Sequence, residues 1–135
     1  MKIVFIDTSY LLALELKSDQ FHEDARKHWQ NLIKSNFSLV TTSYIFDETV
    51  TFLNSRGHRA KAVQLGEKLL VSLSVEMIHV NENLFYEGWN FFRQQKDKRY
   101  SLTDCISFIV MKEKNLETVL TFDKHFIQAG FKTQS

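Results

Sequence analysis

Residues 3–16 have the sequence IVFIDTSYLLALEL, and this stretch contains both local patterns from which the fold is predicted. The first four residues form an unbroken apolar run rich in β-branched side chains, which is typical of a strand buried on both faces of a parallel sheet. The polar residues at 7–9 (Asp, Thr, Ser) are all types that cap the N-terminus of a helix. We therefore predict a strand at 3–6 followed by a helix at 10–16.

The same succession of short apolar strands and longer segments with helical spacing continues along the chain. In the longer segments the apolar residues recur at intervals of three or four, as on one face of a helix. The expected strands are 3–6, 38–41, 75–80 and 119–122, and the expected helices are 10–16, 20–34, 43–55, 59–72, 83–95, 101–114 and 123–129. Strands that alternate with helices indicate an α/β fold with a mostly parallel central sheet.

The composition is that of one globular domain spanning residues 1–135, with 44% hydrophobic and 24% charged residues and no proline. The formal net charge is only +1, so binding to nucleic acid would need a local basic patch. The single cysteine, Cys105, lies in an apolar run and is expected to be a buried thiol. No apolar stretch has membrane-spanning length and no signal cleavage site is evident, so we expect a cytoplasmic protein without a membrane partner.

Two carboxylates, Asp7 and Asp123, each follow a predicted strand directly. Ligands of parallel sheets bind beyond the carboxyl ends of the strands, so both side chains are candidates for one shared crevice. Taken singly, each is better explained as a helix N-cap, because aspartate at a strand-to-helix junction satisfies free backbone N–H groups. The two roles are compatible, since a capping carboxylate keeps one oxygen for a metal.

Two further acids have weaker local support. Asp104 has capping-box spacing from Ser101, but it also begins the most apolar predicted helix, which would carry it towards the core. In the Asp47-Glu48 pair, helical periodicity slightly favours Glu48 as the inward-leaning acid and places Asp47 almost opposite the apolar face. The alternative is that Asp47 and Glu48 are both solvated residues on the surface of the helix.

Four segments resemble the PIN-domain ribonucleases, particularly the VapC-like toxins, in their order and separation along the chain. They are residues 6–14 (IDTSYLLAL), 47–49 (DET), 101–104 (SLTD) and 120–126 (LTFDKHF), with residues 21–25 (FHEDA) as additional support. This resemblance implies a PIN-like three-layer α/β fold with a short, mostly parallel central sheet flanked by helices. It also implies an RNA-cleaving enzyme whose products carry a 5′-phosphate and a 3′-hydroxyl.

The resemblance further implies which residues and partners take part. The metal ligands and catalytic residues would be the four acids Asp7, Glu48, Asp104 and Asp123, supported by Thr8, Ser9 and Thr103. The metal would be Mg²⁺ or Mn²⁺, and the expected partners are an RNA substrate, an antitoxin protein and a second copy in a homodimer. Two carboxylates ~5 Å apart repel by about 3 kcal/mol at an effective dielectric near 20, so converging acids would require cations or protons.

A basic segment precedes the third acid, with Arg93, Lys96, Lys98 and Arg99 leading into residue 101. We expect this segment to contact RNA, with Tyr100 as a stacking surface, although an ordinary solvated loop is the alternative. The five histidines lack zinc-ligand spacing, and His125 is interpreted as a surface residue.

Three other functions have to be weighed against a toxin nuclease. An RNA-processing PIN nuclease without an antitoxin fits the same four acids. A non-catalytic protein-binding module would use those acids only as helix caps. A haloacid-dehalogenase-like phosphatase is strongly disfavoured, because Ser9 stands where such enzymes need a second aspartate.

Overall fold

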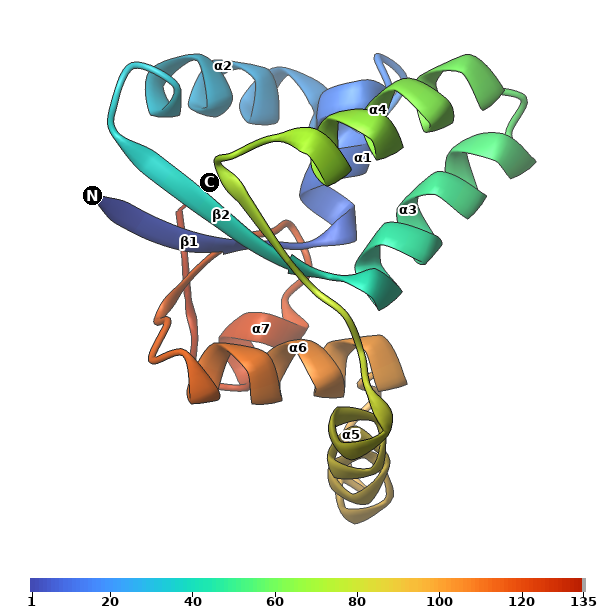
Figure 1. Ribbon diagram of the computed structural model, residues 1–135, viewed down its shortest axis with the longest axis vertical. Helices are drawn as coiled ribbons and strands as arrows, with labels where there is room; N and C mark the ends of the chain where they lie inside the picture. The colour runs from blue at the N-terminus through green and yellow to red at the C-terminus, as the bar shows by residue number, and fades with distance from the viewer. Residues whose placement is uncertain (135) are drawn as a thin grey trace.

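A five-stranded, entirely parallel sheet forms the centre of the computed structural model, which describes residues 1–134 (Figure 1). Its strands are β1 (Lys2–Ile6), β2 (Phe37–Thr42), β3 (Val75–Ile78), β4 (Thr118–Leu120) and β5 (Lys132–Thr133). They lie in the order β3-β2-β1-β4-β5, and every neighbouring pair is parallel. The direction of winding reverses between β1 and β4, which is where ligands bind in open parallel sheets.

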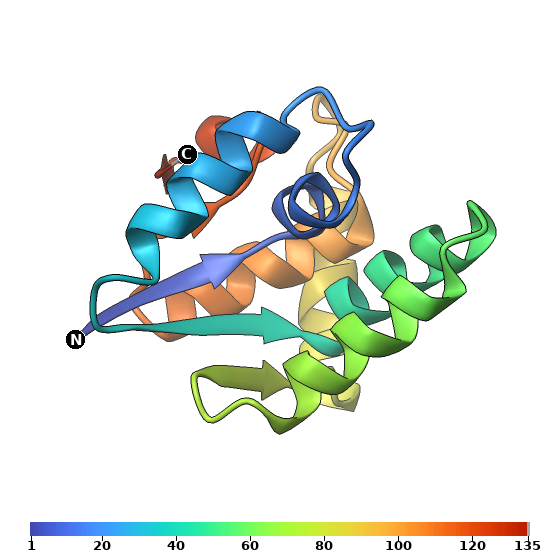
Figure 2. The same cartoon turned by 90° about the horizontal axis from the view of Figure 1, so that it is seen from above.

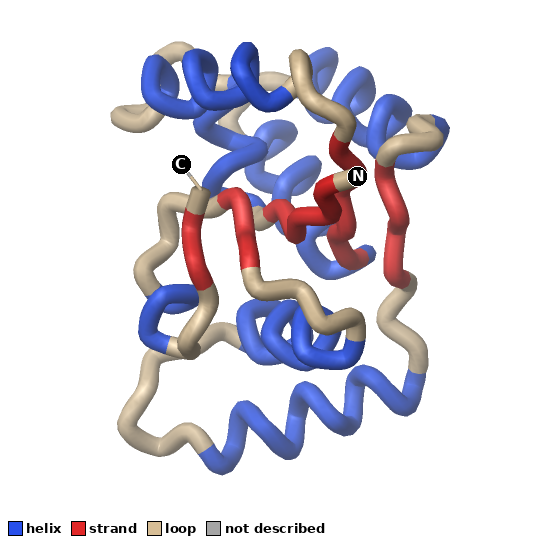
Figure 3. Tube along the Cα trace, turned by 90° about the vertical axis from the view of Figure 1, so that its left-hand side faces the viewer, coloured by secondary structure: helices blue, strands red, loops and turns tan. Residues whose placement is uncertain are grey.

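Helices cover both faces of this sheet and give the predicted three-layer α/β fold. The helices are α1 (Thr8–Glu15), α2 (His22–Leu32), α3 (Ser43–Ser55), α4 (Arg59–Val71), α5 (Glu82–Gln94), α6 (Leu102–Glu113) and α7 (His125–Gln128). Figure 1 shows α1, α2 and α4 above the sheet and α6 and α7 below it. The side view in Figure 3 shows the same layers, with α5 outermost against α6. None of the helices formed by residues 1–134 has the length and apolar character needed to cross a bilayer.

All the predicted strands and helices occur, with differences at the C-terminal end. The strand β5 was not predicted, because two residues are too few to show a periodic pattern, and it is held by parallel pairing with β4. The strand β4 ends at Leu120 instead of residue 122, since a turn follows in which Thr121 Oγ1 accepts the N–H of Asp123 at 2.9 Å. The last helix accordingly begins at His125 instead of residue 123.

The core lies between the sheet and the helices on both sides. On β1, Val4, Phe5 and Ile6 are fully buried, as expected for a central strand of a parallel sheet. The helix α6 is buried over most of its first half, and the predicted burial of the Cys105 thiol is confirmed. Because α6 enters the core at its N-terminus, it carries Asp104 inward with it.

Candidate functional site

A cavity of about 340 Å³ lies at the carboxyl ends of β1 and β4 and contains all four acids. Figure 2 shows that β1, β2 and β3 point in the same direction and that α1 begins where β1 ends. The residues that line the cavity are Asp7, Thr8, Ser9, Leu12, Glu48, Arg99, Ser101, Asp104, Asp123 and His125. The fold therefore brings together side chains from both ends of the sequence at the point where the sheet reverses its winding.

Asp7 is the most deeply placed of the four acids that converge there, with 5% of its surface exposed. It is the N-cap of α1, as predicted, and its Oδ2 accepts bonds from the Ser9 hydroxyl at 2.9 Å and the Thr121 hydroxyl at 2.8 Å. The Ser9 backbone N–H also points to Oδ2, at 3.4 Å. Since these contacts all involve one oxygen, the cap leaves Oδ1 for a ligand.

The hydroxyls of Ser9 and Thr121 connect Asp7 to the segment that follows β4. Their oxygens are 3.0 Å apart, Ser9 Oγ accepts the backbone N–H of Phe122 at 2.9 Å, and Thr121 accepts that of Asp123. Asp7 and Asp123 are thus held in one hydrogen-bonded network. Thr121 was missed at the sequence level, where the only signal was a hydroxyl at the end of a strand inside the LTFD segment.

Asp104 forms the predicted capping box at the start of α6. Its backbone N–H donates to Ser101 Oγ at 2.9 Å, and its Oδ2 accepts the backbone N–H of Ser101 at 3.1 Å. The carboxylate is only 7% exposed. Capping and a place in the acidic cavity therefore coexist in this residue, as they do in Asp7.

His125 is part of this cavity, so its interpretation as a surface residue is corrected. Its Nδ1 lies 2.9 Å from Asp104 Oδ2 and 3.4 Å from Asp123 Oδ1, and its ring packs edge-on against Tyr100. Its backbone N–H also donates to Asp123 Oδ1 at 2.9 Å. Asp104, Asp123 and His125 each offer a ligand atom within 4.8 Å of the others, which is compatible with binding one metal ion.

The electrostatics of the cavity also favour a cation. The pKa of Asp7 is raised to about 6, mainly because the carboxyl is buried and also because Asp104 and Asp123 are negatively charged, while the hydrogen bonds from the Thr121 and Ser9 hydroxyls lower it. Burial likewise raises the pKa of Asp104, although the bonds from Ser101 and His125 oppose this. Oxygen donors crowded in this way suit a hard divalent ion such as Mg²⁺ or Mn²⁺, which removes the cost of keeping them ionised.

Glu48 lines the cavity from α3 and is exposed, whereas the neighbouring Asp47 lines only an adjoining groove. Of these two acids, only Glu48 lines the cavity that contains the other three. Thr8 Oγ1 is buried beside the acids and has no hydrogen-bond partner within residues 1–134, so it remains a candidate donor to a ligand. Thr103 lies in the groove with Asp47 and does not line the acidic cavity.

The four basic residues that precede residue 101 lie in two different places. Arg99 lines the acidic cavity, whereas Arg93, Lys96 and Lys98 are exposed outside it, on the end of α5 and the loop that follows. The expectation that Tyr100 offers a stacking surface is wrong. The residue is only 6% exposed, and its ring packs edge-on against Phe108 with the centroids 5.0 Å apart, because this position turns into the core ahead of α6.

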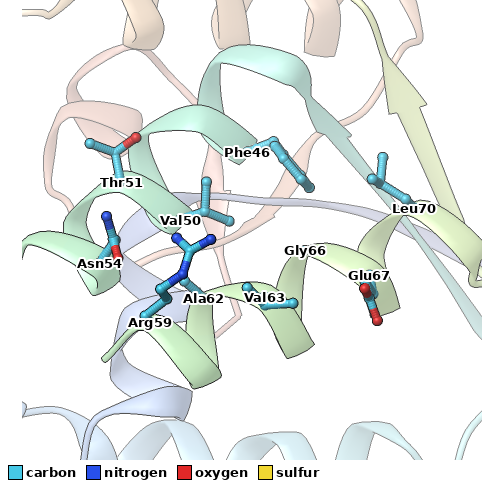
Figure 4. Close-up of a pocket in the computed structure, with 10 residues that line it drawn as sticks. All are labelled: Phe46, Val50, Thr51, Asn54, Arg59, Ala62, Val63, Gly66, Glu67 and Leu70. Carbon is cyan, nitrogen blue, oxygen red and sulfur yellow. The ribbon is translucent and has the colours of Figure 1, made fainter. Parts of the chain in front are cut away.

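Two other cavities have different linings. One, of about 340 Å³, lies between α3 and α4, where Figure 4 shows Arg59 near Asn54 at one end and Glu67 at the other. Its remaining wall is largely apolar. A second, of about 670 Å³, lies over the sheet among α1, α2 and α4 and is also mainly apolar. Each of these two cavities contains a single carboxylate from residues 1–134, so a divalent ion is expected only in the cavity at β1 and β4.

Comparisons with known proteins agree with this fold. The PIN domain family matches residues 4–132. The 23S rRNA-specific endonuclease VapC20 of Mycobacterium tuberculosis is 32% identical over 130 residues, which cover 96% of this chain and 95% of the relative. The crystal structure of VapC20, described as a Sarcin-Ricin loop cleaving toxin, has a TM-score of 0.85 at 30% identity and 95% coverage of both chains.

More distant structures share the fold. A toxin–antitoxin complex from Klebsiella pneumoniae matches with a TM-score of 0.64 at 13% identity, covering 98% of this chain and 96% of the other. VapBC2 from Rickettsia felis, bound to a DNA fragment from its promoter, matches with a TM-score of 0.68 at 14% identity, covering 98% and 97%.

Proposed function

This chain belongs to the PIN-domain family, and from that premise we propose that it is a divalent-metal-dependent endoribonuclease, the toxin of a type II toxin–antitoxin pair. The observation that carries the proposal is the convergence of the four acids on one cavity at the switch point of the sheet. The relative that matches over nearly its whole length is named as a 23S rRNA-specific endonuclease, which supports ribosomal RNA as the substrate class.

The four acids would hold Mg²⁺ or Mn²⁺, since carboxylate oxygens are the preferred ligands of these ions. A divalent ion supplies Lewis-acid chemistry in such a site, because it polarises the phosphate and lowers the pKa of water. Thr8 would add a hydroxyl beside the ion, while Ser9 acts through Asp7. Thr103 would support Glu48 from the adjoining groove.

The chain's own groups orient the acids and the substrate. The Ser9 and Thr121 hydroxyls donate to Asp7, and Ser101 and His125 donate to Asp104, so the directions of these two carboxylates are set before RNA binds. Arg99, in the same cavity, would bind a phosphate oxygen of the substrate through its guanidinium. Arg93, Lys96 and Lys98 would then bind the flanking RNA backbone.

We also propose two protein partners, an antitoxin and a second copy of this chain, because both are usual for the VapC-like members of the family. An RNA-processing nuclease without an antitoxin is distinguished from this proposal by the adjacent gene. If a small antitoxin encoded there is co-purified with the chain and suppresses its cleavage of RNA, the toxin assignment holds. Light scattering on the isolated chain measures whether it forms a dimer.

Cleavage of purified ribosomal RNA tests the enzymatic proposal. We expect cleavage with Mg²⁺ or Mn²⁺, none with EDTA, and a loss of at least about a hundredfold in rate for Asp7→Asn and Asp104→Asn. Asp24→Asn, which alters an exposed carboxylate on α2, is the matched control and keeps the wild-type rate. If the wild type and both site variants leave RNA intact under all conditions, the acids are helix caps and the chain is a binding module.

A further inference from the structure

A second concave surface adjoins the acidic cavity and has a different chemistry. This base groove, of about 460 Å³, is lined by Tyr44, Asp47, Glu48, Thr51, Phe52, Ser55 and Thr103. All but one of these residues project from a single side of α3, and Thr103 comes from the first turn of α6, directly before Asp104. Glu48 lines both the base groove and the acidic cavity, so the two lie next to each other.

The charges of the base groove determine which part of an RNA strand can enter it. Asp47 is exposed along the groove and does not line the acidic cavity, so its carboxylate repels a phosphate group. A nucleobase is neutral and carries N–H donors. The carboxylate of Asp47 and the hydroxyls of Thr51 and Ser55 can accept hydrogen bonds from these donors. The electrostatics therefore admit a base and keep the backbone outside.

Aromatic and basic groups border the same surface. Tyr44 and Phe52 are half-buried and present ring surface to the groove, as side chains that contact unstacked bases do. The guanidinium of Arg56 lies 4.5 Å from the centre of the Phe52 ring and so places a positive charge close to the groove. A neutral base could thus lie inside the groove, while a neighbouring phosphate could bind the positively charged Arg56.

We propose that the base groove binds one unstacked base of the RNA beside the scissile phosphate and that Asp47 selects guanine, an inference that rests on the proposed ribonuclease function. Guanine presents two adjacent donors, N1–H and N2–H, which match the two oxygens of a carboxylate. Adenine and cytosine present a single amino group, and the N–H of uracil lies between two carbonyls that a carboxylate repels. Thr51 Oγ1 donates to Asp47 Oδ1 at 3.2 Å and orients the carboxylate, whose remaining lone pairs can accept from a base.

Cleavage of a pool of single-stranded RNA with randomised sequence, followed by sequencing of the new ends, tests this selection. For the wild type we expect guanine to occur about ten times as often as each other base at one position next to the cut, as one bidentate base contact provides. Asp47→Asn removes most of this enrichment, because an amide cannot accept hydrogen bonds from both guanine donors with two oxygens. Thr51→Ala, which removes the orienting hydroxyl, lowers the enrichment partly, and Asp24→Asn leaves it unchanged.

A binding measurement separates this proposal from the proposed function. Fluorescence anisotropy with labelled five-nucleotide RNAs in EDTA compares one central guanine with one central uracil in an otherwise identical strand. Tighter binding of the guanine strand that is lost in Asp47→Asn supports the base groove, even if no RNA is cleaved in the presence of metal. Equal affinity for both strands in the wild type, or a preference that persists in Asp47→Asn, overturns the proposal.

Discussion

The imidazole Nδ1 of His125 lies 2.9 Å from Oδ2 of Asp104, which joins the start of α7 to the first turn of α6. The same carboxylate oxygen accepts the backbone N–H of Ser101. Asp104 is thus held from two sides in a position where burial raises its pKa. An outer residue that fixes a ligand carboxylate in this way commonly affects both metal affinity and activity.

Replacing His125 tests whether it positions Asp104. We expect His125→Ala to weaken Mg²⁺ or Mn²⁺ binding and the rate of RNA cleavage by about 10–100-fold, because the carboxylate loses its orienting bond. The metal titration of activity measures the effect, since excess ion restores part of the lost rate when positioning is at fault. The exposed His79→Ala is the control. An unchanged metal requirement in His125→Ala would show that this contact is incidental.

Binding of a divalent ion stabilises the folded chain if the four acids are its ligands. At a hundredfold excess over Kd, Mg²⁺ or Mn²⁺ should raise the melting temperature by about 5–10 °C, because the ion binds the folded state and not the unfolded one. Asp7→Asn should abolish most of this rise, since it removes one charge and one ligand oxygen. Differential scanning fluorimetry measures both effects. Melting curves that respond neither to the ion nor to the substitution would argue against the site.

Without metal, stability should fall as the pH rises through the acidic range. The unfolded chain releases the Asp7 proton near the ordinary aspartate pKa of 3.8, whereas the folded chain holds it up to about 6. Between these values the folded state binds more protons, so the free energy of unfolding decreases by about 3 kcal/mol in total and levels off about one pH unit above the folded pKa. The raised pKa of Asp104 acts in the same direction.

Urea unfolding in EDTA at pH 4, 5, 6 and 7 measures this loss of stability. Asp7→Asn should be the more stable protein at pH 7 and should show a much flatter profile, while Asp24→Asn keeps the wild-type slope. If the two substitutions gave identical profiles, Asp7 would not be the group responsible.

The contact between α5 and α6 depends on the absence of a side chain at Gly88. A Cβ atom at this position would collide with Cγ1 of Ile106, which is fully buried. We expect Gly88→Ala to lower the free energy of unfolding by about 1–3 kcal/mol, even though alanine is the better helix former by about 1 kcal/mol. Urea unfolding measures the change.

Two variants show whether this loss comes from the collision. Ile106→Ala removes the obstructing Cγ1, so the double variant with Gly88→Ala should lose less stability than the sum of the two single losses. Gly66→Ala on α4 should be tolerated much better, because its Cβ would lie 3.2 Å from the tip of the Phe46 ring and 3.6 Å from Val50 Cγ1. Equal losses for Gly88→Ala and Gly66→Ala would contradict the steric explanation.

The sequence by itself determined the local structure and much of the candidate site. The types of nearly all elements, the caps at Asp7 and Asp104 and the burial of Cys105 follow from residues within about four positions of one another. For this reason the strand and helix of residues 3–16 were predictable. Three of the four acids were singled out by position, and family resemblance was needed to choose Glu48.

Only the tertiary structure decided which of these residues meet. The Thr121 hydroxyl reaches Asp7 across 114 positions of sequence, and His125 reaches Asp104 across 21. Both contacts exist because β4 pairs beside β1, and strand order is not encoded in local periodicity. The burial of Tyr100 and the pairing of β5 have the same origin, since each depends on a distant neighbour that supplies the packing or the hydrogen bonds.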